Sequence, residues 1–217
     1  MGGLGLLMRR RAIQAHPAAG VDKYKFKDAL VEEILMANGV SSNGEYITRD
    51  DIAKVSNIGT WFKGSAITSF DELDDFVNVT SLSANAFNGC PNLVSVGTQN
   101  IITLGDQVFY GSNNIQQLIL PNVKTIGTYQ MRYNSALNFL DIGANCSWIA
   151  TRGFSDCPNV AAIICRNVNP PGLDYNTSLA TNSCPIYVPD EAVETYKTAS
   201  VWSSYASRIK PLSEYQG

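Results

Sequence analysis

The segment Phe87-Asn-Gly-Cys-Pro-Asn-Leu93 returns later in the chain as Phe154-Ser-Asp-Cys-Pro-Asn-Val160. Two related segments lie between them, Phe109-Tyr-Gly-Ser-Asn-Asn-Ile115 and Met131-Arg-Tyr-Asn-Ser-Ala-Leu137. The four segments begin 22, 22 and 23 residues apart. A step of this size that holds through four units is the signature of a repeat architecture, and it decides the fold before any single helix or strand is considered.

Positions outside these segments keep the same step. Each of four further columns holds an apolar or small side chain in every unit: Leu82, Leu104, Ile126 and Ile149; Val79, Ile101, Val123 and Cys146; Val96, Leu118, Leu140 and Ile163; Thr98, Leu120, Ile142 and Cys165. A generic apolar rhythm would not hold register through four units. The pattern therefore predicts stacked coils, because a single unit cannot bury its apolar face alone.

Each coil is expected to contain one short strand. In Leu118-x-Leu120 and Leu140-x-Ile142 the apolar residues alternate, which predicts a strand with one face inward. The pairs Leu104-Gly105 and Ile126-Gly127 predict a turn after the second apolar position. The predicted fold class is an α+β repeat, a leucine-rich-repeat solenoid of 22–23-residue coils with a helical N-terminal cap and a C-terminal cap made of a strand and a helix.

One column inside the coil is small and polar. Ser112 and Asn134 share it with Cys90 and Cys157, and their side chains are expected to hydrogen-bond backbone groups inside the coil. Cys90 and Cys157 would lie three coils apart, or about 14 Å, which is too far for a disulfide.

The five cysteines are predicted to be buried thiols that pack as small hydrophobes. Their odd number and their placement in core columns fit no disulfide framework. A bond between Cys165 and Cys184 is left open, since these two could lie on adjacent strands.

The pattern x-Ile-Gly-x-x-x-Phe-x-x-Cys-x-x-Leu resembles the BspA-like leucine-rich repeat, which is common in surface and secreted proteins of gut bacteria and in proteins of their phages. The resemblance covers about residues 60–215, and Thr125-Ile126-Gly127 and the segment 154–160 carry it best. The stretch from Pro185-Ile-Tyr-Val-Pro189 to Ile209-Lys-Pro211-Leu resembles the terminal module of that family. This resemblance implies a repeat surface that binds other molecules.

The chain is expected to divide into four parts: a tail at 1–20, a helical cap at 21–60, the solenoid at 61–165 and a capping module at 166–217. Tyr24 to Ala37 has apolar residues at helical spacing, and Asn38-Gly39 predicts the end of that helix. Thr48-Arg-Asp-Asp51 predicts a capping box at the start of a second helix.

No residue pattern points to catalysis or to a metal. The single histidine, His16, lies beside Pro17 with no partner for a nucleophilic site nearby. The resemblance implies a calcium-loop-like stretch at 41–51, but its early ligand positions fall on Gly39, Ser41 and Asn43, none of which is acidic. The acidic run 71–75 is interpreted as a helix start with Leu73 and Phe76 buried. The prediction is a protein that is not an enzyme and has no cofactor.

Composition excludes several partners. The net charge of −3 gives no argument for nucleic-acid binding, which usually requires a basic patch or stripe. No apolar run approaches the ~18 residues of a membrane-spanning helix. Charged residues make up only 16% of the chain, which suits stacked repeats and surfaces that contact protein.

Strand residues that alternate with the core columns should form an outward ladder. It consists of Ser95, Gln117, Phe139 and Ala162, and beside these Gly97, Ile119, Asp141 and Ile164. Exposed apolar strips mark interaction sites, so a partner is predicted to bind at Gln117, Ile119, Phe139, Asp141 and Ile164. The alternative is that the capping module or the N-terminal cap covers these residues.

The tail joins a short apolar plug to a cationic block, and it is interpreted as an assembly anchor made of Leu4, Leu6, Leu7, Met8, Arg9, Arg10 and Arg11. Its order is wrong for an export signal. This favours a bacteriophage virion component, because phage proteins assemble in the host cytoplasm. The alternative is a bacterial cell-surface module for adhesion or recognition that binds a host protein or glycan. Expected partners are other virion proteins or a host-surface receptor, and a homo-oligomer is left open.

Overall fold

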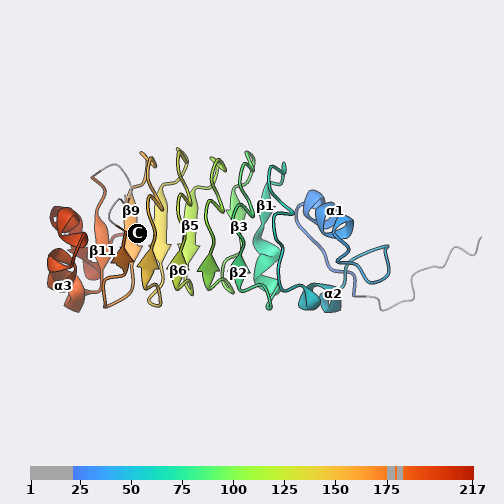
Figure 1. The fold of residues 1–217 in the computed structure, drawn as a ribbon, viewed down its shortest axis with the longest axis horizontal. Coiled ribbons are helices and arrows are strands. Elements are labelled where there is room, and N and C mark those ends of the chain that lie inside the picture. Colours follow the sequence, from blue (N-terminus) through green and yellow to red (C-terminus); the bar gives the residue numbers. More distant parts are fainter. Residues whose placement is uncertain (1–21, 175–178, 180–182) are drawn as a thin grey trace, which may run out of the picture.

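The computed structural model describes residues 22–174, 179 and 183–217. Short parallel strands stack along the long axis, with helices at both ends (Figure 1). The α-helices are α1 Ala29–Ala37, α2 Arg49–Lys54 and α3 Val193–Thr198, and the 3-10 helices are η1 Asp71–Asp75, η2 Asp190–Ala192, η3 Trp202–Arg208 and η4 Leu212–Glu214. The strands are β1 Ser69–Phe70, β2 Ser81–Leu82, β3 Ser95–Val96, β4 Thr103–Leu104, β5 Gln117–Leu120, β6 Thr125–Ile126, β7 Phe139–Ile142, β8 Trp148–Ile149, β9 Ala162–Cys165, β10 Gly172–Leu173, β11 Ile186–Val188 and β12 Ile209–Pro211.

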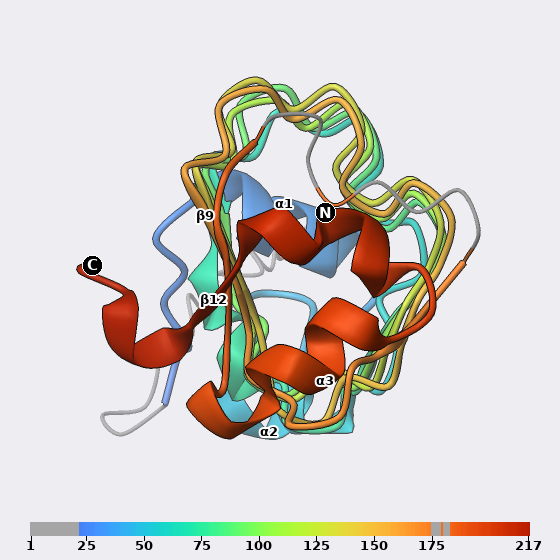
Figure 2. The same ribbon diagram turned by 90° about the vertical axis from the view of Figure 1, so that its left-hand side faces the viewer.

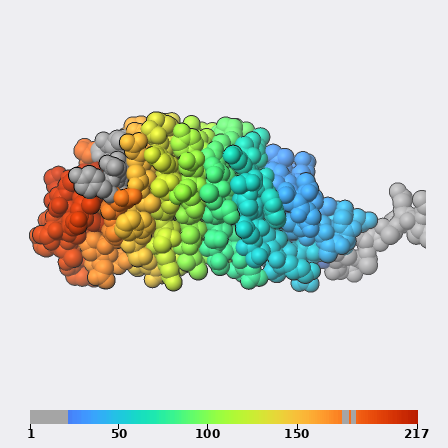
Figure 3. Space-filling model, in the orientation of Figure 1, coloured from blue at the N-terminus to red at the C-terminus, as the bar shows by residue number. Residues whose placement is uncertain are grey.

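Each coil contributes two strands, so the prediction of one strand per coil was wrong. The main sheet has the order β12-β11-β9-β7-β5, and the side sheet has the order β10-β8-β6-β4-β2. Leu104 and Ile126 pair with each other in the side sheet, and the turns predicted after them are present at 106–111 and 128–133. A two-residue strand carries too little alternation to be recognised from the sequence. Successive repeats form consecutive bands across the molecule (Figure 3).

The repeat columns form the core, as predicted. Leu82, Leu104, Ile126 and Ile149 are all at most 2% exposed, and so are the members of the Phe/Met column at 87, 109, 131 and 154. The rings of Phe87 and Phe109 stack 5.8 Å apart with an angle of 9° between their planes. One core position differs, since Val96 is only partly buried while Leu118, Leu140 and Ile163 of its column are buried.

Side chains of the small polar column form hydrogen bonds with backbone groups of neighbouring coils, which confirms the prediction for Ser112 and Asn134. The Ser112 hydroxyl donates to the Phe87 carbonyl at 2.6 Å and accepts from the Cys90 amide at 3.0 Å. Asn134 Nδ2 donates to the carbonyls of Ser112 and Ile115, both at 3.1 Å.

The cysteines of this column also donate hydrogen bonds. Cys90 Sγ lies 2.9 Å from the Phe62 carbonyl, and Cys157 Sγ lies 3.0 Å from the Met131 carbonyl. Burial raises the pKa of Cys157 to about 12, so this thiol keeps its proton and remains a donor.

All five cysteines are free and buried. Cys165 and Cys184 are not paired with each other. Ile163 pairs with Ile186, so Cys184 lies before β11 begins and Cys165 lies near its far end. Burial raises the pKa of the Cys146 thiol to about 11, and it raises the pKa of Cys165 as well. These thiols therefore pack as the small, protonated side chains that the sequence predicts.

Asparagine side chains join successive coils at two corners. Asn100 Nδ2 donates to the Asp74 carbonyl at 2.6 Å, and Asn122 Nδ2 donates to the Gln99 carbonyl at 2.7 Å. At the other corner, similar bonds run from Asn92, Asn114 and Asn159 to carbonyls of the preceding coil. These amides satisfy carbonyls where the chain turns between strands.

The first helix is shorter than predicted. It begins at Ala29 with Asp28 as its N-cap, whereas the apolar spacing predicted a start at Tyr24. Tyr24 instead donates its amide to the Ile47 carbonyl at 2.7 Å, which holds this segment beside the loop before α2. The capping box of Thr48 and Asp51 is present at α2, as predicted.

The C-terminal segments pack across the last coil, where α3 and η3 lie over the end of the stack (Figure 2). Tyr196 and Trp202 are both buried and meet edge to face at 4.7 Å. Trp202 Nε1 donates to the Pro171 carbonyl at 2.7 Å, and Tyr196 Oη donates to the Asn167 carbonyl at 2.8 Å. The Trp202 indole and the Tyr196 phenol thereby hold the terminal helices against the last coil.

Candidate binding face on the main sheet

Six of the eight residues of the outward ladder predicted from the sequence lie on the main sheet, whereas Ser95 lies on β3, which pairs with β1 instead, and Gly97 follows β3 and is buried. Gln117, Phe139 and Ala162 are register partners across β5, β7 and β9. Ile119, Asp141 and Ile164 form the second row in the same way. The five predicted binding residues therefore share one face.

These residues differ in their exposure. Gln117 is exposed, and Ile119 is 43% exposed. Phe139 is half-buried, and Ile164 is only 1% exposed. The expectation that Ile164 contributes to an exposed apolar strip was wrong. It lies beside Tyr187 of β11, where the C-terminal segment passes outside the sheet (Figure 2).

The Asp141 carboxylate forms an ion pair within the protein. Its carboxylate accepts two hydrogen bonds from Arg166, at 2.8 Å from Nε and 2.7 Å from Nη2, and Asp141 is 8% exposed. The hydrogen bonds to Asp141 raise the pKa of Arg166. A bidentate pair of this geometry orders the outer face between β7 and the corner after β9.

A groove with a volume of about 590 Å³ crosses the C-terminal half of this face. Three aromatic rings line it. The Tyr215 ring stacks on Phe139 at 5.8 Å and meets Tyr187 at 5.1 Å. Polar side chains complete the wall: Gln117, Asn138, Glu214 and Gln216. Aromatic rings with polar tips and amides between them are typical of surfaces that bind other proteins.

A second hollow of about 310 Å³ adjoins the groove and shares Gln117 with it. It lies between the coils of β3 and β5, with Ile119 on one side and Asp71 and Asp74 on the other. The two hollows together make the outer face of β3, β5, β7 and β9 the candidate binding surface.

The sequence did not indicate Tyr187 or Tyr215 as site residues. Tyr187 lies in the middle of Ile186–Val188, and its outward position follows from alternation in that strand. Tyr215 follows the last 3-10 helix, and no local signal places its ring on Phe139, which lies far away in the sequence.

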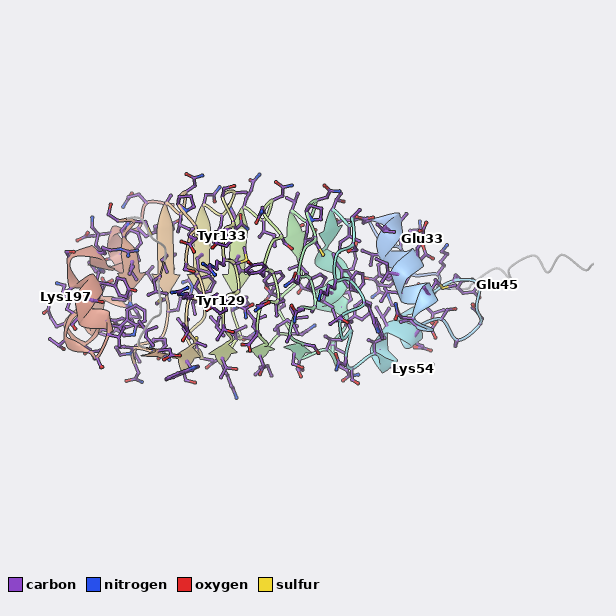
Figure 4. The ribbon with its side chains drawn as sticks, turned by 45° about the horizontal axis from the view of Figure 1, so that its top comes forward. Glu33, Glu45, Lys54, Tyr129, Tyr133 and Lys197 are labelled. Atoms are coloured by element: carbon purple, nitrogen blue, oxygen red, sulfur yellow. The ribbon has the colours of Figure 1, made fainter. Side chains whose placement is uncertain are left out.

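A second exposed cluster lies in the turn between β6 and β7. The Arg132 guanidinium lies 4.4 Å from the centre of the Tyr133 ring and 5.5 Å from that of Tyr129, and its Nε donates to Asp156 at 3.1 Å. Tyr133 is 52% exposed, and Figure 4 shows both tyrosines near the middle of the stack. Neither tyrosine lines the two hollows.

Several sequence predictions fall on residues outside the described ranges, namely His16 and the anchor residues Leu4, Leu6, Leu7, Met8, Arg9, Arg10 and Arg11. Within residues 22–174, 179 and 183–217, no group of three or more histidine, cysteine or acidic side chains could hold a metal ion. In the same part of the chain, no helix has the length and apolar character needed to cross a bilayer.

Comparison with known proteins agrees with this geometry. The family model described as "BspA type Leucine rich repeat region (6 copies)" matches residues 54–170. Repeats of this family are typically non-catalytic modules associated with bacterial surfaces and with protein binding. The stretch after residue 170, which the sequence analysis compared with the family's terminal module, lies outside the match. No curated protein matches the chain significantly. Six copies of the repeat span more than half of the sequence, and the chain therefore belongs to the BspA-type leucine-rich-repeat family.

Proposed function

We propose that this protein is a non-catalytic binding module of the cell surface, built as a capped solenoid, that holds a protein partner on the outer face of its main sheet. The observation that carries the proposal is the pair of adjoining hollows that share Gln117. The helices at both ends support the capping role, because the open ends of a stack would otherwise expose apolar surface and unpaired strand edges. The rigid repeat would present the face without the ordering cost that a loop incurs.

Ile119 is the residue whose change should separate binding from folding. Replacing it with Asp should weaken partner binding about 30-fold, because it places a charge in the centre of an apolar contact. The melting temperature should change little, since Ile119 is 43% exposed. Biolayer interferometry against a panel of extracellular-matrix proteins and mucins measures the affinity.

Tyr133→Ser is the matched control, since it removes a large exposed side chain that lines neither hollow. If affinity falls for Tyr133→Ser and stays unchanged for Ile119→Asp, the binding face lies elsewhere. Light scattering of the unliganded protein shows whether the partner is a second copy of this chain.

The second hypothesis is a bacteriophage virion component anchored by residues 1–20. Its support is the sequence of the tail, where four large apolar side chains precede three arginines. Such a plug could bury its apolar side chains in a groove while the arginines pair with carboxylates at the rim.

Truncation tests this hypothesis. A chain that begins at Val21 should melt like the full chain, because the repeats supply the core, yet it should fail to enter assembled particles. Incorporation is measured by mass spectrometry of purified virions, and normal incorporation of the shortened chain would contradict an anchoring role.

A further inference from the structure

The sheet on the binding face is interrupted between β3 and β5. These strands belong to consecutive coils, yet β3 pairs with β1 and β5 begins a separate sheet. Among the residues that the structure describes, no backbone hydrogen bond joins 94–97 to 116–119. The neighbouring coils do make such bonds at the equivalent position, from the Asn138 amide to the Gln116 carbonyl at 2.8 Å and from the Ala161 amide to the Asn138 carbonyl at 2.7 Å. The edge of β5 that faces β3 therefore receives no backbone hydrogen bond from that strand.

Side chains hold the two coils together on either side of the interruption. The Thr98 hydroxyl donates to the Ile119 carbonyl at 2.5 Å. Asn114 Nδ2 donates to the Pro91 carbonyl at 2.6 Å. The opening is thus local to the strand segment and does not separate the coils.

The interruption gives access to the interior of the coil. Val96 is partly exposed, although the other members of its core column are buried. Gly97 is buried and packs closely on η1, where an added Cβ would lie 2.5 Å from the Asp71 carbonyl oxygen and 2.6 Å from the Asp74 amide nitrogen and carboxylate. The resulting hollow of about 310 Å³ has an apolar floor and wall at Val96, Leu118 and Ile119.

The rim of the hollow is acidic. Asp71 forms an ion pair with Lys27 at 2.8 Å. Asp74 accepts a hydrogen bond from the Gln99 amide at 2.8 Å, but it has no cationic partner within the described ranges. Burial raises the pKa of Asp74, and the nearby carboxylates of Asp71 and Asp75 add to this effect. A cation beside Asp74 would favour its charged form and so offset both the cost of its burial and the repulsion from Asp71 and Asp75.

We propose that this hollow holds a lysine or arginine side chain of an extended segment of the partner protein that crosses the outer face of the sheet. This inference rests on the proposed function, because it names the chemistry of the partner at the same face. The aliphatic stem of a basic side chain would pack on Val96 and Ile119, and its charged end would reach Asp74.

The test uses the full chain and a phage-displayed library of random dodecapeptides. Enriched peptides should contain a lysine or arginine. Synthetic copies should bind Asp74→Asn about tenfold more weakly than the unmodified protein, since one charge of an ion pair is lost. Asn at 74 keeps an oxygen that can accept from the Gln99 amide, so the fold should be unchanged. Asp106→Asn is the matched control, because Asp106 likewise accepts from a backbone amide, that of Thr128 at 2.8 Å, and does not line the hollow.

A double-mutant cycle decides the outcome. Changing the basic residue of the peptide to Gln should weaken binding to the unmodified protein and have little further effect on Asp74→Asn. Additive losses, or no enrichment of basic peptides, would overturn the inference. Peptides that require Ile119 but are insensitive to Asp74→Asn would leave the proposed function standing while the inference fails. Peptides that bind Ile119→Ser as tightly as the unmodified protein would contradict the proposed function itself, because serine removes the apolar contact without adding a carboxylate that a basic residue could pair with.

Discussion

Replacing Asn134 with Leu should cost on the order of 4–6 kcal/mol in the free energy of unfolding. The Asn134 side chain is fully buried, and it serves four backbone groups. Its Nδ2 donates to two carbonyls at 3.1 Å, and its Oδ1 accepts from the amides of Ala136 and Leu137 at 2.8 and 2.9 Å. Leucine branches at the same carbon but is larger and has no polar atoms, so all four groups would stay buried without partners, at about 1–3 kcal/mol each before relaxation.

Urea denaturation followed by circular dichroism measures this loss. Asn134→Ser should cost less, because Ser112 and the thiols of Cys90 and Cys157 occupy the same column and donate to the same kind of carbonyl. Asn113→Leu is the control on the surface, where Asn113 is exposed and the change should stay within about 0.5 kcal/mol. Equal losses for Asn134→Leu and Asn113→Leu would show that the interior amide is not needed to satisfy the coil.

Replacing Gly143 with Ala should cost about 3 kcal/mol or more. A Cβ at this position would overlap the carbonyl oxygen of Pro121 and lie 2.5 Å from its carbonyl carbon. Both atoms are backbone of the preceding coil and cannot rotate away. The Gly143 amide also donates to the Leu120 carbonyl at 2.9 Å, so the coils cannot separate without breaking that bond. Overpacking against a fixed backbone costs more than overpacking against a side chain.

Gly153→Ala is the matched control for this substitution. There the nearest atom to an added Cβ is the Ile149 side-chain Cγ2 at 3.2 Å, which a small rotation relieves. Thermal unfolding should therefore show a large fall in the melting temperature for Gly143→Ala and a small change for Gly153→Ala. Comparable changes in the two variants would mean that the coils near Pro121 can shift without cost.

Some of the correct sequence predictions rest on residues that lie close together in the chain. The capping box at Thr48 and Asp51 needs only residues three apart, and it is present. The burial of Leu73, within the acidic run 71–75, and of Phe76, directly after it, was also predicted correctly. The start of the first helix was wrong because apolar spacing continues upstream of Asp28, whereas the side chain of Asp28 caps the helix at Ala29.

The repeat register determined which side chains face the core and which face outward. Identical spacing places equivalent residues in one column whatever the detailed path of the chain, so Gln117, Ile119 and Phe139 could be assigned to one outer face from their numbers alone. The same register identified the interior position of Asn134 and its need for backbone partners.

Contacts between distant segments decided the rest. The Tyr215 ring packs on Phe139, and the C-terminal segment passes beside β11, where Ile164 is buried. The Asp141 carboxylate accepts hydrogen bonds from Arg166. The interruption between β3 and β5 and the close approach of Gly143 to Pro121 also have no signal in the pattern, since position 143 shares its column with a proline and an arginine. Periodicity reports which way a side chain points, but exposure and fit depend on which remote segment packs against it, and only the tertiary structure settles that.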